Sequence, residues 1–126
     1  MSFRMLQADV LRWAKDKDLL HAENAEKQFM KFIEEVFEFK FEMENSKNYE
    51  DICEHLKIAG TFAKNRNQRD MKLEMGDIFV TLIILCEQIG IDPEECLSMA
   101  YEKISKRKGR TINGSFYKQE DLEGME

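Results

Sequence analysis

Nine consecutive residues without a charge, from Ile78 to Cys86, restrict the possible folds of this chain more than any other stretch. Thr81 is the only polar residue among them. At about 100° per residue the run covers every side of a helix, which predicts a central, buried helix over 71–90. Glu74 and Asp77 precede the run, three residues apart and therefore on one face of that helix. Carboxylates are rarely buried unless they are paired or bind a metal, so this acidic pair needs a chemical explanation.

Apolar residues at helical spacing predict four more helices, so the expected fold is an all-α bundle of about four to five helices. The four approximate ranges are 2–15, 22–46, 49–63 and 93–106. Polar stretches at 45–48 and 64–70 are expected to break the chain on either side of the third of these. The residues of that short helix that are expected to face inward are Ile52, Leu56 and Phe62.

Capping and turn residues define the ends of these elements. Ser2 and Asp92 are suited to helix N-caps, and Pro93 suits the first position of the last helix. The Asn113-Gly114 pair marks a turn in a C-terminal arm, residues 108–126, which is either a loop or a small hairpin. With 126 residues and no linker, the chain is expected to form a single domain, 1–126.

The second helix carries apolar residues on two sides of an acidic stripe. The first apolar group is Phe29, Phe32, Ile33, Val36, Phe39 and Met43, and the second is Met30, Phe37 and Phe41. The stripe between them holds Glu34, Glu35, Glu38 and Glu42. A helix packed from two directions suggests that another copy of the chain completes the bundle, as a homodimer or homotetramer.

Composition excludes several classes of protein. The formal charge of −6 argues against general nucleic-acid binding. The central apolar run is less than half the roughly 20 residues that span a bilayer, so no membrane insertion is expected. The three cysteines form no CxxC motif and no secretory signal precedes them, which indicates reduced thiols and a cytoplasmic location.

Two acidic pairs are the strongest candidates for chemistry. Glu35 and Glu38 on the second helix, like Glu74 and Asp77, are three residues apart. If the two helices pack side by side, four carboxylates converge, and divalent cations would offset their repulsion. An all-oxygen set without His or Cys favours Mg²⁺, with Mn²⁺ as a substitute. The alternative is that Glu35 and Glu38 belong to a solvated helix face. A di-iron site is not expected because no Glu-x-x-His sequence is present.

A basic cluster marks the end of the last helix, formed by Lys103, Lys106, Arg107, Lys108 and Arg110. It can complement the helix dipole or bind polyphosphate oxygens. The chain has no GxxxxGK[ST], so it is not a P-loop protein. Trp13 recurs at helical spacing with Phe3, Leu6 and Val10, and either packs in the core or stacks on a substrate base.

The acidic motifs also carry a resemblance to a known family. Glu34-Glu35-Val36-Phe37-Glu38, followed by Glu74-Met75-Gly76-Asp77, resembles the ExxE…ExxD signature of the MazG-like all-α nucleoside triphosphate pyrophosphohydrolases. Trp13 before the first motif, and Lys103 and Arg107 near the end, extend the likeness over most of the chain. The segment between the motifs is longer than the usual spacer of that family, and the predicted helix 49–63 would absorb the difference.

The resemblance implies an oligomeric bundle that uses Mg²⁺ to hydrolyse (d)NTPs to the monophosphate and pyrophosphate. It implies that Glu35, Glu38, Glu74 and Asp77 ligate the metal and that Glu38 or Glu35 orients or deprotonates the attacking water. Substrate contacts are expected from Lys103, Arg107, Arg110 and Trp13. The alternative function is a non-catalytic helical module that binds nucleotides or protein partners.

Overall fold

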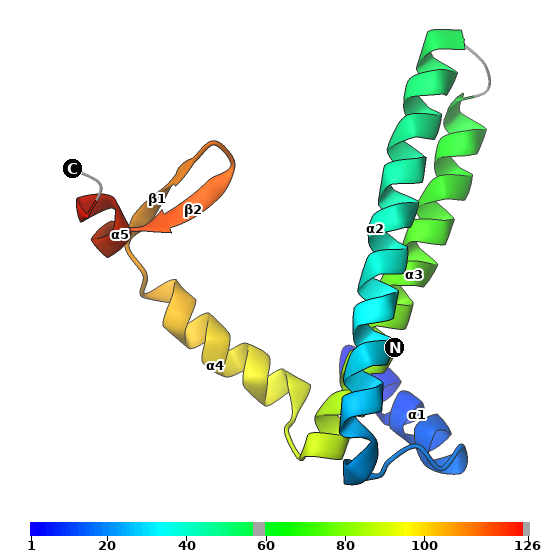
Figure 1. Ribbon diagram of the computed structural model, residues 1–126, viewed down its shortest axis with the longest axis vertical. Helices are drawn as coiled ribbons and strands as arrows, with labels where there is room; N and C mark the ends of the chain where they lie inside the picture. The colour runs from blue at the N-terminus through cyan, green and yellow to red at the C-terminus, as the bar shows by residue number, and fades with distance from the viewer. Residues whose placement is uncertain (57–59, 125–126) are drawn as a thin grey trace. The chain divides into compact units, whose positions relative to one another are not determined.

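Helices account for most of the described chain, as the sequence predicts. The computed structural model describes the backbone of residues 1–56 and 60–124 and the side chains of residues 1–43 and 69–124. The elements in order are α1 (Phe3–Asp16), the 3-10 turn η1 (Ala22–Asn24), α2 (Ala25–Leu56), α3 (Gly60–Ile89), α4 (Pro93–Ser105), β1 (Gly109–Ile112), β2 (Ser115–Lys118) and α5 (Gln119–Glu123). Figure 1 shows these elements along the chain.

The chain forms two compact units, Met1–Ile91 and Asp92–Glu126. The second unit begins at Asp92 and therefore contains α4 as well as the C-terminal arm, residues 108–126.

The first unit is dominated by the antiparallel pair of long helices, α2 and α3, which lie side by side (Figure 1). Two sequence predictions are wrong here. Residues 45–48 do not break α2, and residues 64–70 are part of α3 rather than a loop. Neither stretch contains proline, and polar residues such as Asn, Lys and Gln cost a helix less than about 0.7 kcal/mol each relative to alanine. Polarity alone therefore does not interrupt a helix that has a long partner to pack on.

The predicted helix over 49–63 is not separate where the structure describes it, because residues 49–56 belong to α2 and residues 60–63 belong to α3. Residues 57–59 lie outside the described part of the chain. The inward orientation expected for Ile52, Leu56 and Phe62 concerns side chains outside the described residues.

The core of the first unit lies on the C-terminal half of α3, as the uncharged run predicts. Thr81, Ile83, Ile84 and Cys86 are all buried. Ala14 of α1 is fully buried in the same unit, and α1 contacts α3. Gln88 donates a hydrogen bond of 2.8 Å from Nε2 to the carbonyl of Leu19, which fastens the segment after α1 to α3.

Helix α1 begins as expected, with Ser2 as N-cap accepting a hydrogen bond from the amide of Met5 at 3.2 Å. Phe3 makes an edge-to-face contact with Phe79 of α3, with ring centroids 5.9 Å apart. The predicted apolar face is only partly covered, because Phe3 and Trp13 each remain 50% exposed. The two buried residues of α1 are Gln7 and Ala14, which are two turns apart.

The second unit joins α4 to a two-stranded antiparallel hairpin. Asp92 is the N-cap of α4 and Pro93 its first residue, as predicted. Of the alternatives for the arm, the structure shows the hairpin: β1 pairs with β2, and Asn113 and Gly114 turn the chain with φ angles of +50° and +81°. Left-handed backbone at both turn positions is the reason that Asn-Gly pairs favour tight hairpins.

The short helix α5 closes the hairpin. The amide of Gln119 donates to the carbonyl of Lys108 at 2.8 Å, and Leu122 is buried where α5 packs on the strands. Helix α4 buries none of its residues within this unit. Among the described residues of both units, no helix has a stretch long and apolar enough to cross a membrane.

Candidate functional site

The packing register of α2 and α3 determines which acidic residues meet. Gln28 of α2 donates a hydrogen bond of 3.2 Å from Nε2 to the carbonyl of Thr81 on α3. The helices are antiparallel, so seven residues further along α2 and seven residues back along α3 bring Glu35 opposite Glu74. Two helical turns of seven residues repeat nearly the same face, roughly 10 Å from the Gln28 contact.

Three of the four predicted metal ligands come together at this level of the helix pair. One carboxylate oxygen each from Glu35, Glu74 and Asp77 lies within 4.8 Å of the other two. The three-residue spacing of Glu74 and Asp77 directs both toward α2, as the sequence predicts. We call these three residues the acidic cluster.

Few hydrogen bonds or cations of the described chain offset the negative charge of the acidic cluster. Glu35 is only 7% exposed, and its Oε1 lies 3.4 Å from the Lys31 ammonium one turn earlier. Hydrogen bonding to Glu35 is the main reason that the pKa of Lys31 is raised. Oε2 of Glu35 and Oε2 of Glu74 are buried and have no hydrogen-bond partner. A buried carboxylate oxygen without a hydrogen-bond donor is energetically costly, so a ligand bound to either atom would stabilise it.

The pKa of Glu74 is raised in this environment. Burial raises the pKa of its carboxyl group, and the negative charges of Asp77, Glu35, Glu42 and Asp70 raise the pKa further. Desolvation and like charges both disfavour the ionised form. A nearby cation would have the opposite effect on the pKa.

Two of these neighbours were not predicted from the sequence. Glu42 is part of the predicted acidic stripe without being a predicted ligand, and Asp70 is part of a predicted polar break, yet both lie close enough to Glu74 to affect its pKa. The seven-residue spacing from Glu35 to Glu42 and the four-residue spacing from Asp70 to Glu74 were the available signals. Neither is informative until the register of the two helices is known.

The acidic cluster fits a hard divalent cation. Its donors are all carboxylate oxygens, and no histidine or cysteine belongs to the group. Glu35 and Glu74 each also have a buried oxygen without a hydrogen-bond partner. Such a set suits Mg²⁺ or Mn²⁺, which can keep waters in the remaining coordination positions.

Glu38, the fourth predicted ligand, lies outside the acidic cluster. It is exposed one turn beyond Glu35 on α2 and is not among the three carboxylates that meet. Its role as a ligand or as the residue that orients water stays a prediction.

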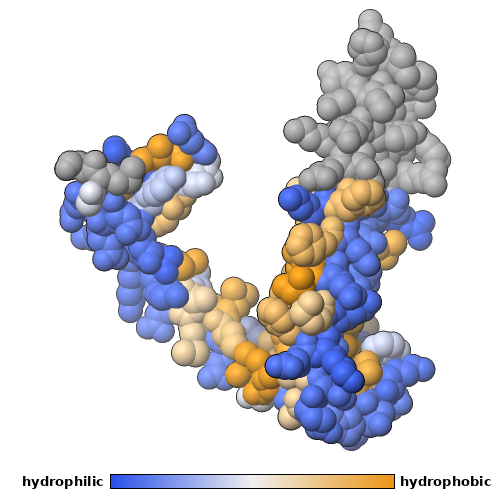
Figure 2. Space-filling view, viewed as in Figure 1, coloured by the Kyte–Doolittle hydropathy of each residue, from blue (hydrophilic) through white to orange (hydrophobic). Residues whose placement is uncertain are grey.

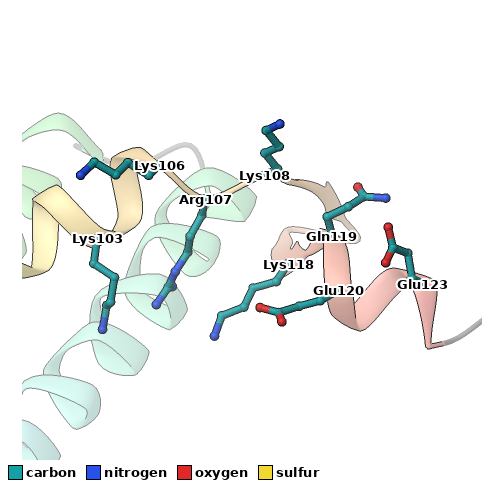
Figure 3. A pocket seen from close by; sticks show the side chains of 8 residues that line it. All are labelled: Lys103, Lys106, Arg107, Lys108, Lys118, Gln119, Glu120 and Glu123. Atoms are coloured by element: carbon teal, nitrogen blue, oxygen red, sulfur yellow. The ribbon is translucent and has the colours of Figure 1, made fainter.

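The predicted basic residues belong to the second unit, where several of them surround a shallow groove. The groove has a volume of about 560 Å³ and is shown in Figure 3. It is lined by Lys103, Lys106, Arg107, Lys108, Lys118, Gln119, Glu120 and Glu123. We call it the basic groove. Lys118 of β2 was missed in the sequence, because only the pairing of the hairpin brings it near the end of α4.

Arg110 does not line the basic groove. It pairs with Tyr117 in the hairpin, whereas Lys118 pairs with Gly109. Side chains alternate between the two faces of a strand pair, so Arg110 and Lys118 lie on opposite faces. Trp13 lies in α1 of the first unit with half of its surface exposed. Substrate contacts by Arg110 and Trp13 stay predictions.

The fold and the acidic cluster define the class: a mainly helical protein with a candidate site for a divalent cation on its longest helix pair. No protein-family model, no curated protein and no solved structure matches the chain.

Proposed function

We propose that the protein is a Mg²⁺-dependent nucleoside triphosphate pyrophosphohydrolase of the MazG-like type. The observation that supports this proposal is the acidic cluster. Carboxylates of Glu35, Glu74 and Asp77 converge from two helices, and two of their buried oxygens have no partner. A structural ion pair would bring opposite charges together. It does not explain why three carboxylates converge beside a single lysine, Lys31.

In this proposal Glu35, Glu74 and Asp77 would hold the divalent cation. When bound, Mg²⁺ would supply a Lewis acid that offsets the charge of the phosphates and makes water more acidic. Glu38, which is exposed beside the cluster, orients the attacking water and accepts its proton. The water oxygen forms a bond to the α-phosphorus while the bond from that phosphorus to the bridging oxygen breaks. The monophosphate and pyrophosphate are the products.

The resemblance also implies phosphate contacts by Lys103 and Arg107, which line the basic groove of the second unit. A guanidinium can bind two phosphate oxygens at once, and an ammonium supplies a compact charge.

Self-association of the chain is part of the proposal. Apolar side chains remain exposed on both sides of the acidic stripe of α2, including Phe29, Met30, Phe37 and Phe41. An apolar groove of about 470 Å³ runs between α2 and α3 next to Phe29 and Met30, with Leu85 and Ile89 on the other side. Figure 2 shows apolar residues on the visible face of this helix pair. Exposed apolar surface of this extent is typical of an interface, and a second copy of the chain would cover it.

The direct test is a pyrophosphate-release screen over dNTPs, NTPs and (p)ppGpp, with and without Mg²⁺. We expect release only with the metal. Asp77→Asn and Glu74→Gln should each reduce turnover by about 100-fold or more, because a lost ligand weakens both metal binding and charge neutralisation. Glu87→Gln is the matched control, since Glu87 lies exposed on the same helix. It should retain full activity.

A second measurement separates the roles of the acids. Glu38→Gln should lose turnover while keeping the Mn²⁺ affinity of the wild type, measured by electron paramagnetic resonance of free Mn²⁺. Equal loss of Mn²⁺ affinity in Glu38→Gln and Asp77→Asn would make Glu38 a ligand instead. Mg²⁺-dependent stabilisation by nucleotides without any pyrophosphate release would refute the enzyme and favour a non-catalytic nucleotide-binding module.

A further inference from the structure

The basic groove has its own geometry, independent of the acidic cluster. Figure 3 shows the side chains of Lys103, Arg107 and Lys118 pointing to the same side of the groove, whereas those of Lys106 and Lys108 point away. Arg107 and Lys118 are only partly exposed, in a unit whose other basic side chains are exposed. Three cations therefore face a common space from two different elements, the end of α4 and strand β2.

These three cations are unpaired in the described chain, although Glu120 and Glu123 line the same groove. Lys106 is paired with Glu102, with Nζ and Oε1 3.4 Å apart. Lys103, Arg107 and Lys118 form no ion pair or side-chain hydrogen bond with any described residue. Bringing like charges together while partly removing them from water is unfavourable unless an anion joins them. The groove is thus prepared for a multivalent anion.

Lys118 is held in position by the hairpin. It stands opposite Gly109 at the open end of the strand pair. The next residue, Gln119, donates its amide to the carbonyl of Lys108 at 2.8 Å, and buried Leu122 anchors α5 on the strands. These contacts join β2 to the segment directly after Arg107, so folding of the hairpin fixes the third cation beside the first two.

We propose that the basic groove binds a small oligophosphate anion, of the pyrophosphate or tripolyphosphate class, and that Lys118 is a direct contact. Three converging cations match an anion with several charged oxygens better than a single monovalent one. A long nucleic-acid strand fits poorly, because Glu120 and Glu123 also line the groove. Residues 92–126 contain eight acidic and six basic side chains, a formal charge of −2, which opposes an extended polyanion. The inference deepens the phosphate contacts that the proposed function assigns to Lys103 and Arg107, because it names the anion and adds Lys118. Binding itself requires neither a metal nor hydrolysis.

The test is calorimetric titration of the full chain with inorganic tripolyphosphate in buffer that contains EDTA. We expect one anion per chain, with an affinity that falls as salt rises. Lys118→Gln and Lys103→Gln should each weaken binding by about tenfold, the scale of one charge-assisted hydrogen bond. Glu120→Gln should bind as tightly as the wild type or more tightly, because it removes a competing negative charge.

Arg110→Gln is the matched control, because it removes one positive charge from the opposite face of the same hairpin. It should bind tripolyphosphate like the wild type. Absence of binding by the wild type, or equal loss in Arg110→Gln and Lys118→Gln, would overturn the proposal. Tighter binding of a short single-stranded DNA than of tripolyphosphate, with the same dependence on Lys118, would also overturn it.

The amide resonances of β1 and β2 should show that the hairpin of each variant is folded. Lys103→Gln tests the groove without altering the hairpin.

The same titration with Asp77→Asn separates this inference from the proposed enzyme. Asp77 lies in the other unit, so its variant should bind tripolyphosphate unchanged in EDTA even though it releases no pyrophosphate. A wild-type chain that binds the anion but hydrolyses no nucleotide would refute the hydrolase and leave the groove standing.

Discussion

Folding disfavours the ionised form of the Glu74 carboxyl group. Burial and the charges of four acidic neighbours raise its pKa above the ordinary value of 4.5. The raised pKa adds stability to the fold below about pH 4.5, and this contribution is lost as the pH rises through the folded-state pKa. In EDTA, Glu74→Gln should therefore melt at a higher temperature than the wild type at pH 7, by a few degrees Celsius. The difference should shrink toward pH 4 in thermal melts followed by circular dichroism.

Glu87→Gln is the control for this pH series, since Glu87 is exposed on the same helix. Its difference from the wild type should be flat with pH. Addition of Mn²⁺ should raise the melting temperature of the wild type more than that of Glu74→Gln, because the cation stabilises the ionised cluster. A melting difference between Glu74→Gln and the wild type that is the same at every pH would contradict the electrostatic account.

Local spacing explains which parts of the site could be predicted from single residues. Glu74 and Asp77 are three apart on a helix, so their common direction follows from helical geometry alone. Their meeting with Glu35 depends on the register of α2 and α3, and the sequence supplied only the possibility that these helices pack. The position of Glu42 beside Glu74 depends on the register of α2 and α3. The position of Lys118 depends on the register of β1 and β2. Neither register can be read from the spacing of residues along the chain.

At the scale of elements, the hairpin depends on one close approach. A Cβ on Gly109 would collide with the carbonyl of Tyr117 and would lie 2.6 Å from Cζ of the Phe116 ring. Gly109→Ala should therefore separate β1 from β2, at a cost of about 1–3 kcal/mol to the hairpin. We expect faster amide hydrogen exchange in both strands and weaker tripolyphosphate binding, because Lys118 pairs with residue 109.

Gly124→Ala is the matched control for this substitution. Gly124 follows α5 with φ −70°, and a Cβ there would meet its nearest atom, the carbonyl oxygen of Asp121, at an ordinary 3.6 Å. Its hydrogen exchange should match the wild type. Unchanged strand protection in Gly109→Ala would show that the hairpin can move to accept the methyl group.

The helices themselves were predictable where the sequence carries a strong signal. The uncharged run of α3, the Ser2 cap, and the Asp92 and Pro93 start of α4 are all present. The predicted helix breaks at 45–48 and 64–70 are wrong, because polar residues there do not interrupt the helices. Those residues permit a helix, and the choice between helix and loop was decided by packing of α2 on α3, which is a tertiary effect.

At the scale of the whole molecule, the described side chains leave much apolar surface uncovered. Phe37 and Phe41 of α2 are 65% and 64% exposed, although the acidic cluster sits on the same helix. A helix that uses one face for α3 and the carboxylates has a second apolar face available for another chain. This division would allow α2 to carry the acidic cluster on one face and the proposed interface between copies of the chain on another.

Self-association should therefore depend on Phe37 and Phe41. In sedimentation velocity we expect the wild type to run as a multiple of its 14.9 kDa chain. Burial of a phenylalanine stabilises an interface by about 1.5 kcal/mol or more, so Phe37→Ser with Phe41→Ser should weaken association by about 100-fold or more. Lys40→Ser, an exposed polar position between them, should leave the oligomer intact. A wild-type chain that stays monomeric at every concentration would show that this apolar face has another role.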